Sequence, residues 1–147
     1  MAFKFRLQSV LFFRTSLEEK AQLALSREQR LLEDYRQRLQ RLQDERQAMM
    51  ADLEQRKQGA MAASLYALYV EGLLGMEREI AGQADTVAGQ GRVVEDCRQE
   101  LARRMQDRKV MDRLKEKDYR LFIAETLKRE QKQSDEQAIL RYGKGRM

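Results

Sequence analysis

The sequence contains no proline among its 147 residues, and this absence removes the strongest helix breaker. A proline in a helix interior costs about 3 kcal/mol, because it lacks an N–H and clashes with the preceding turn. Charged residues make up 36% of the chain, against roughly 25% in ordinary globular domains. Long helices that each bury only a narrow apolar stripe give this balance. The composition therefore predicts an elongated, all-helical protein.

Histidine is also absent, and Cys97 is the only cysteine. The sequence thus lacks the commonest general base and metal ligand, and one cysteine can form neither an intrachain disulfide nor a zinc site. No glycine-rich phosphate loop follows a predicted strand. We therefore expect no enzyme activity, no cofactor and no metal, and we interpret Cys97 as a small apolar residue on a helix face.

No apolar run approaches the roughly 20 residues of a membrane span. The apolar start of the chain is broken by Lys4 and Arg6 and has no signal-peptide cleavage site. We therefore expect a soluble, cytoplasmic protein. The net charge of +5 is spread along the chain, and acidic residues interrupt its densest basic run, 103–117. This run is interpreted as a solvated helix face, with docking of an acidic protein as one alternative and nucleic-acid binding as the least favoured.

A seven-residue apolar repeat predicts a first helix from about Leu7 to Gln58. One series consists of Leu25, Leu32, Leu39, Arg46 and Leu53, and a second consists of Tyr35, Leu42 and Met49. Upstream, a series one residue out of phase predicts a local change of supercoiling; its members are Val10, Leu17, Ala24 and Leu31. A helix of this extent would be about 80 Å long, too long for an element of a compact globule.

The nearly uncharged segment 59–75 predicts the turning point of a hairpin, with bends at Gly59, Gly72 and Gly75 and a short helix over 61–71. A second arm follows over about 76–137, and a frayed tail over 138–147. The apolar repeat of the second arm consists of Ile80, Val87, Val94 and Leu101, with Leu114 and Leu121 after a phase shift near Met105 and Arg108. Glycines at 75, 82 and 89 are interpreted either as allowing close packing against the first arm or as marking a flexible, partner-adaptable stretch.

The predicted fold class is all-α: a long two-helix antiparallel coiled-coil hairpin with a short helical apex, in a single domain over 1–147 whose first arm covers about 3–58. Because the arms have similar lengths, the two chain ends are expected to meet at one tip. Leu11 would then lie close to Gln131.

Both ends of the sequence carry further patterns. The start reads Phe3-x-Phe5-x-Leu7-x-x-Val10-Leu11-x-x-Arg14, followed by Glu18, Glu19, Ala21 and Leu25. The second arm carries Arg108-Lys109, Leu114-x-Glu116-Lys117, Tyr119, Glu130-Gln131 and Asp135-Glu136-x-Ala138. Together these residues resemble the flagellar export protein family FliJ, over nearly the whole chain. The resemblance implies a cytoplasmic component of the flagellar type III export apparatus, shaped like the central stalk of a rotary ATPase.

The resemblance also implies partners and contact residues. The end of the coil would enter the hexameric flagellar export ATPase, and other surfaces would bind the cytoplasmic domain of the export gate and the export chaperones. ATPase-ring contact would involve Phe3, Phe5, Leu7, Leu11, Arg14, Glu130, Gln131 and Asp135. Gate or chaperone contact would involve Tyr35, Leu39, Leu42, Tyr66 and Tyr69. The protein would be a monomer alone, bind no nucleic acid, and reach the inner membrane at the flagellar base only through partners.

Two alternatives stay open at this point. The related stalk proteins of injectisomes have the same general character, and a self-associating coiled-coil scaffold would show the same heptads. A scaffold would be a dimer or larger in solution, whereas a stalk would be an elongated monomer.

Overall fold

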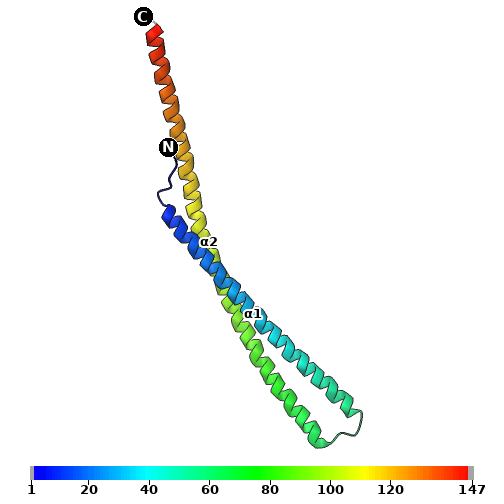
Figure 1. Ribbon diagram of the computed structural model, residues 1–147. Coiled ribbons are helices and arrows are strands. Elements are labelled where there is room, and N and C mark those ends of the chain that lie inside the picture. The colour runs from blue at the N-terminus through cyan, green and yellow to red at the C-terminus, as the bar shows by residue number, and fades with distance from the viewer. Residues whose placement is uncertain (1, 146–147) are drawn as a thin grey trace. The chain divides into compact units, whose positions relative to one another are not determined.

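The computed structural model describes residues 2–145, and these form two helices joined by a short connection (Figure 1). Helix α1 covers Gln8–Lys57, 50 residues, and α2 covers Ala63–Gly145, 83 residues. Residues 2–145 contain no strand, and the two helices pack against each other. The predicted all-α, two-helix hairpin is therefore confirmed, and the bounds of α1 agree with the first helix predicted from about Leu7 to Gln58 within one residue at each end.

The helices divide into two units. The hairpin unit consists of residues 20–101, in which α1 and the first half of α2 run antiparallel on either side of the connection (Figure 1). The terminal unit consists of residues 2–19 and the described part of α2 from Ala102 on. The interpretation of the whole chain as one domain stays a prediction.

The less exposed side chains of α1 follow two uninterrupted seven-residue series. The first consists of Leu11, Glu18, Leu25, Leu32, Leu39, Arg46 and Leu53, and the second of Arg14, Ala21, Glu28, Tyr35, Leu42 and Met49. The predicted a/d seam of α1 is thereby confirmed. The predicted change of phase is not needed, because the first series continues without interruption through Leu11, Glu18 and Leu25. Of the four residues predicted out of phase, Val10 and Leu31 are each 37% exposed, whereas Leu17 and Ala24 are half-buried. Charged side chains occupy seam positions near the start of α1, and their polarity concealed the repeat.

The same regularity extends through α2. Its first series consists of Leu73, Ile80, Val87, Val94, Leu101, Arg108, Lys115 and Phe122, and its second of Tyr69, Met76, Gln83, Gln90, Cys97, Arg104, Met111 and Asp118. The predicted phase shift near residue 105 is therefore wrong. Leu121, which was placed in the seam, is 55% exposed, and Phe122 lies there instead. Arg108 keeps the period because its long side chain has acidic partners.

The turning point of the hairpin is shorter than predicted. Between α1 and α2, only residues 58–62 lie outside a helix, and the segment predicted as a separate apical helix, 61–71, forms the first turns of α2 from Ala63 on. Of the three predicted bends, only Gly59 lies in the connection; α2 continues through Gly72 and Gly75. Gly72 and Gly75 do not end the helix, because apolar neighbours such as Leu73 pack in the seam and stabilise it.

The repeated glycines of α2 do not allow closer packing against α1. A Cβ atom added at Gly75 or Gly82 would meet nothing within 4 Å, and one at Gly89 would meet only Arg92 of the same helix. The close-packing interpretation is therefore wrong for these three positions. The alternative, a partner-adaptable stretch, stays a prediction.

The two chain ends do not meet at one tip. Leu11 packs beside Met111, and residues 127–145 of α2 are all exposed and helical (Figure 1). Gln131 follows Met111 by about 30 Å along the helix axis, so the predicted proximity of Leu11 and Gln131 is wrong. The predicted frayed tail is helical through Gly145, and residues 146 and 147 lie outside the described residues. Equal arm lengths were assumed in the prediction, but α2 is much the longer helix.

Candidate protein-interaction surfaces

The start of the chain folds onto α2 and closes the terminal unit. Phe5 and Leu11 are each 7% exposed and cluster with Met111, which is 5% exposed. Phe3, Leu7 and Leu114 pack against this cluster. The N–H of Gln8 donates to the carbonyl oxygen of Phe5 at 3.2 Å, so that α1 begins directly after the buried phenylalanine. This N-terminal cluster (Phe3, Phe5, Leu7, Leu11, Met111 and Leu114) fixes the first residues against α2 by apolar burial.

Aromatic rings extend the N-terminal cluster along α2. The ring centroid of Phe3 lies 5.3 Å from that of Tyr119, edge to face, and 5.4 Å from that of Phe122 in a tilted arrangement. Such ring pairs contribute about 0.5–1.5 kcal/mol beyond the burial of their area. The non-helical start of the chain is thereby held near residues 119–122 of α2.

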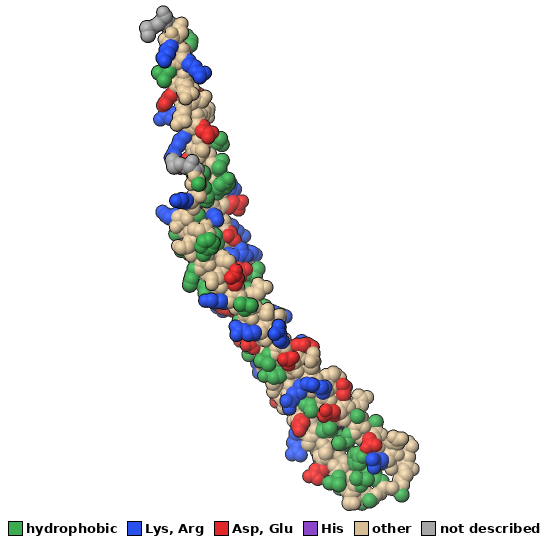
Figure 2. Space-filling view, viewed as in Figure 1, with side chains coloured by type: hydrophobic (Ala, Val, Ile, Leu, Met, Phe, Trp, Pro, Cys, Tyr) green, Lys and Arg blue, Asp and Glu red, His purple; other side chains and the backbone are tan. Residues whose placement is uncertain are grey.

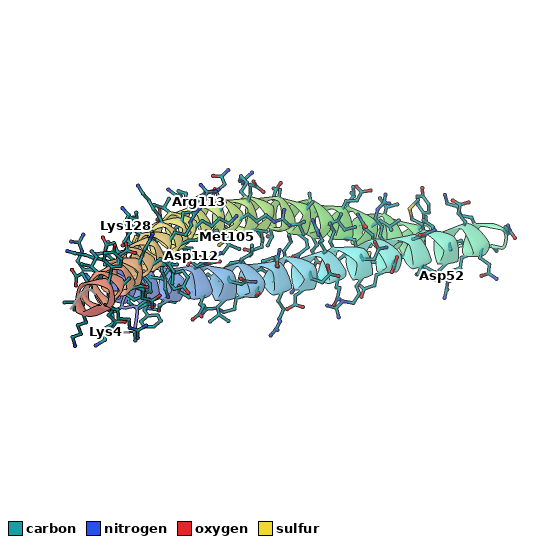
Figure 3. All side chains as sticks on the ribbon, turned by 90° about the horizontal axis from the view of Figure 1, so that it is seen from above. Lys4, Asp52, Met105, Asp112, Arg113 and Lys128 are labelled. Atoms are coloured by element: carbon teal, nitrogen blue, oxygen red, sulfur yellow. The ribbon has the colours of Figure 1, made fainter. Side chains whose placement is uncertain are left out.

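A charged layer crosses the seam next to this cluster. The Arg108 guanidinium donates to the carboxylates of Glu18 on α1 and Asp112 on α2. The Arg108 side chain is 26% exposed and that of Glu18 is 16% exposed. These hydrogen bonds, that to Glu18 first, raise the pKa of Arg108 above its ordinary value. In Figure 3, Asp112 lies on the side of α2 that faces α1, while Arg113 lies on the opposite side.

One turn away, Nη1 of Arg14 donates to the carbonyl oxygen of Asp107 at 2.9 Å. The structure therefore brings together five of the residues assigned to ATPase-ring contact, namely Phe3, Phe5, Leu7, Leu11 and Arg14. The other three lie in the exposed stretch of α2 beyond Leu127; they are Glu130, Gln131 and Asp135. The ring-contact role of all eight stays a prediction.

Polar layers also cross the seam of the hairpin unit. Nε2 of Gln90 donates to the carbonyl oxygen of Glu28 at 3.0 Å and to its carboxylate at 2.5 Å. Nε2 of Gln83 donates to the carbonyl oxygen of Tyr35 at 3.0 Å. Like the layer at Arg108, each of these pairs places one particular residue of α1 opposite one particular residue of α2. Shifting either helix by a turn would leave the polar groups unpaired, so the layers specify one register.

The closed end of the hairpin unit carries a tyrosine network. The Tyr69 hydroxyl donates to Oδ2 of Asp52 at 2.5 Å, and the Arg56 guanidinium carbon lies 5.8 Å from the Tyr69 ring centroid. This hydrogen bond lowers the pKa of the Asp52 carboxyl, which the charge of Arg56 lowers further, and raises the pKa of the Tyr69 hydroxyl. Nζ of Lys57 lies 5.2 Å from the Tyr66 ring centroid. Asp52 lies on α1 close to the connection (Figure 3).

The residues assigned to gate or chaperone contact fall into two groups. Tyr35, Leu39, Leu42 and Tyr69 occupy seam positions and are partly buried, whereas Tyr66 is 43% exposed. The sequence interpretation missed Leu68 and Leu74, which are 64% and 52% exposed near Tyr66 in the same helix. If the seven-residue series of α2 is continued toward the start of the helix, Tyr69 falls in the seam, whereas Tyr66, Leu68 and Leu74 fall outside it. This signal could have identified the exposed residues. The contact role of these residues stays a prediction.

Among residues 2–145, no three histidine, cysteine, aspartate or glutamate side chains gather as metal ligands. Neither α1 nor the described part of α2 is apolar enough over a sufficient length to cross a bilayer.

The fold defines a class: a two-helix antiparallel coiled coil. The sequence profile described as "Flagellar FliJ protein" matches residues 3–146, and the chain belongs to the FliJ family. This is a family of non-catalytic, stalk-type proteins of flagellar type III export, so the suspected resemblance is confirmed. No curated protein sequence matches the chain.

A solved structure has the same fold. The chain is similar to a putative YscO homolog from Chlamydia trachomatis with a TM-score of 0.73, and the match covers 96% of each chain. The two sequences are 19% identical over this match. At this level of identity the likeness concerns the fold, and it shows that the long helix pair recurs in a distant sequence.

Proposed function

We propose that this protein is the central stalk of the hexameric flagellar export ATPase and an adaptor to other parts of the export apparatus. One observation carries the proposal: α2 continues past the N-terminal cluster, and every residue from 127 to 145 is exposed. A helical stretch this exposed gains little stability from packing against the rest of its own chain. Contact with a surrounding protein, such as the pore of an ATPase ring, would supply those contacts.

In this proposal the N-terminal cluster and the exposed stretch of α2 have different tasks. Glu130, Gln131 and Asp135 contact the ring directly, since their side chains reach solvent. Phe5 and Leu11, with the residues packed on them, hold the base of that stretch in place. A helix with different side chains on each face contacts each ring subunit differently, and it thereby favours different conformations around the ring.

We further propose that the closed end of the hairpin unit serves the adaptor role, contacting the cytoplasmic domain of the export gate and the export chaperones. Tyr66 is the exposed aromatic side chain there, with Leu68 and Leu74 close by in sequence and also exposed. Tyrosine is enriched in the centres of interfaces. Tyr35, Leu39, Leu42 and Tyr69 would act mainly by keeping the two helices paired. The protein would then work in the cytoplasm, bound at the flagellar base through its partners.

The stalk role is tested by ATP hydrolysis. The export ATPase of the same bacterium is assayed with the full chain, with a chain that ends at residue 126, and with Glu130→Ala, Gln131→Ala and Asp135→Ala combined. We expect stimulation to be lost with the shortened chain and reduced with the triple variant. The matched control is Tyr66→Ala with Leu68→Ala at the other end of the hairpin unit, which should stimulate normally.

Circular dichroism and the urea midpoint separate contact from folding in this assay. The shortened chain should retain the unfolding midpoint of the full chain, because α1 does not cover the removed residues. Phe5→Ala is unsuitable as a test of contact, since that side chain is buried. Full stimulation by a folded chain that ends at residue 126 would refute the stalk proposal.

The same material also tests the scaffold alternative. Sedimentation velocity should give the mass of one chain with a large frictional ratio. A dimer or larger species that persists on dilution would favour a self-associating scaffold instead.

A further inference from the structure

One side of the terminal unit carries an apolar stripe outside the seam. On α1, Val10, Phe13 and Leu17 share a face, since they are three and four residues apart. On α2, Val110, Leu114 and Leu121 likewise share a face. Phe13 is 63% exposed, Val110 and Leu121 are each 55% exposed, and Val10 is 37% exposed. These six residues are called the lateral stripe.

The two halves of the lateral stripe lie on the same side of the helix pair. Val10 and Leu17 directly precede seam residues of α1, and Leu114 and Leu121 directly precede seam residues of α2. In an antiparallel coiled coil, the residues just before the first seam series of one helix lie on the same side of the seam as the residues just before the first seam series of the other helix. Leu114 also packs against the N-terminal cluster, which makes the apolar surface continuous with the core.

Basic side chains accompany the lateral stripe on α2. Lys117 falls between Leu114 and Leu121 at helical spacing, and Lys128 follows Leu121 by seven residues on the same face. Both lysines are exposed. Figure 2 shows hydrophobic, basic and acidic side chains interspersed on the visible face of this unit. The opposite side of the pair is more acidic, since Glu19, Asp112 and Glu116 lie there beside a single lysine of α2, Lys109. On the stripe side, Asp107 is the acidic residue that precedes Leu114 by seven positions.

We propose that the lateral stripe is a docking site for an amphipathic helix of another protein, with acidic side chains beside its apolar face, which completes a three-helix bundle. Such a helix buries Phe13, Val110 and Leu121 and places carboxylates near Lys117 and Lys128. This site lies on the side of the terminal unit and does not depend on the stalk proposal.

Charge excludes a second copy of this chain as the occupant. A two-fold contact between copies would bring the same stripe, and therefore the same lysines, against each other. The exposed end of α2 is also a poor occupant, because it continues the same unbroken helix that carries Val110 and Leu121 and does not fold back onto it.

A helical display library tests the proposal. Each library member has leucine or isoleucine at the seam positions, and each flanking position is drawn equally from Glu and Lys. The full chain, immobilised, should select a pool enriched in Glu. With Lys117→Glu and Lys128→Glu combined, the selected pool should be enriched in Lys. Equal use of Glu and Lys, or no capture above an unrelated coiled coil, would overturn the proposal.

Two further variants locate the site. Val110→Glu with Leu121→Glu should lower capture at least about tenfold, because two large apolar contacts are lost. The matched control, Phe12→Glu with Ile123→Glu, changes exposed apolar residues on the opposite side and should leave capture unchanged. Equal losses in both pairs would contradict the assignment. A dimer in sedimentation that the Val110 and Leu121 pair dissociates would show that a second copy is the occupant, which also overturns it. If that pair loses helicity, the lysine variants still decide the question, since they leave the apolar face intact.

Discussion

The charged layer formed by Glu18, Arg108 and Asp112 shows how single residues determine the pairing of the two helices. Arg108 stands where an apolar residue would pack best, yet it satisfies a carboxylate from each helix. A partly buried charge is costly without a partner, so this arrangement stabilises the observed register more than any shifted one. The layer therefore adds little to the free energy of unfolding, and its main effect is to disfavour shifted registers of the two helices.

Substitution of Arg108 should reveal this distinction. Arg108→Leu alone leaves Glu18, whose side chain is 16% exposed, without its partner, and should lower the free energy of unfolding by about 1–3 kcal/mol. Glu18→Leu with Arg108→Leu should return the free energy of unfolding to within about 1 kcal/mol of the unmodified chain, because two apolar side chains then fill the seam. Urea denaturation followed by circular dichroism measures both. Equal destabilisation by the single and double variants would contradict this account.

The hydrogen bond between Tyr69 and Asp52 should be visible in a titration. It raises the pKa of Tyr69 above its ordinary value of about 10, and it lowers that of Asp52. The stability it contributes is therefore present below pH 10 and is lost as pH rises through the folded-state pKa of Tyr69. On the acid side, the contribution is lost as pH falls through the lowered pKa of Asp52.

Tyr69 can be followed by its ring-carbon chemical shift in a chain labelled at tyrosine. Its titration midpoint should move back toward the ordinary value in Asp52→Asn. The spectra of the unmodified chain under the same conditions serve as the reference. A Tyr69 midpoint that does not respond to the substitution would show that the hydrogen bond is absent in solution.

At the scale of whole elements, α2 remains helical despite repeated glycines, and the cost of these glycines is open to measurement. A Cβ at Gly82 meets nothing within 4 Å. Gly82→Ala should therefore raise the free energy of unfolding by about 0.5–1 kcal/mol, since alanine loses less backbone entropy in a helix. The neighbouring Ala81→Gly should lower it by a similar amount. If both variants had a higher urea midpoint than the unmodified chain, or both had a lower one, the open, fully helical environment would be contradicted.

The elements also show what the sequence could and could not reveal. Leu32, Leu53 and Val94 were correctly placed in the seam, because an apolar residue every seven positions is a strong signal. Seam positions held by Glu18 and Arg108 gave no such signal, so the phase appeared to shift around them. The extent of the apex was overestimated because Gly72 and Gly75 were interpreted as bends, whereas tertiary packing keeps them in α2.

The candidate site was predicted in part. The pattern at the start of the chain grouped Phe3, Phe5 and Leu11 as ring contacts. The structure packs them in one cluster and buries Phe5 and Leu11, and their contact with a ring stays a prediction. Their partners Met111, Tyr119 and Phe122 depend on how far the two helices are offset, and no local pattern encodes that offset. The same offset separates Gln131 from Leu11.

At the scale of the whole molecule, the account depends on unequal helices: the start of α1 packs beside α2 near residue 111, and residues 127–145 of α2 are all exposed. Each proposal uses a different part of this arrangement. The stalk proposal needs the exposed end of α2, and the lateral docking site needs the paired part of the terminal unit.

Distances between nitroxide labels test this pairing most directly. Labels are attached at positions 12 and 109 in one sample, and at positions 12 and 132 in another, and double electron–electron resonance is recorded on the monomeric full chain. The first pair should be close, and the second should be separated by about 35 Å along α2. The opposite order, with position 12 near position 132 and far from position 109, would contradict the central claim.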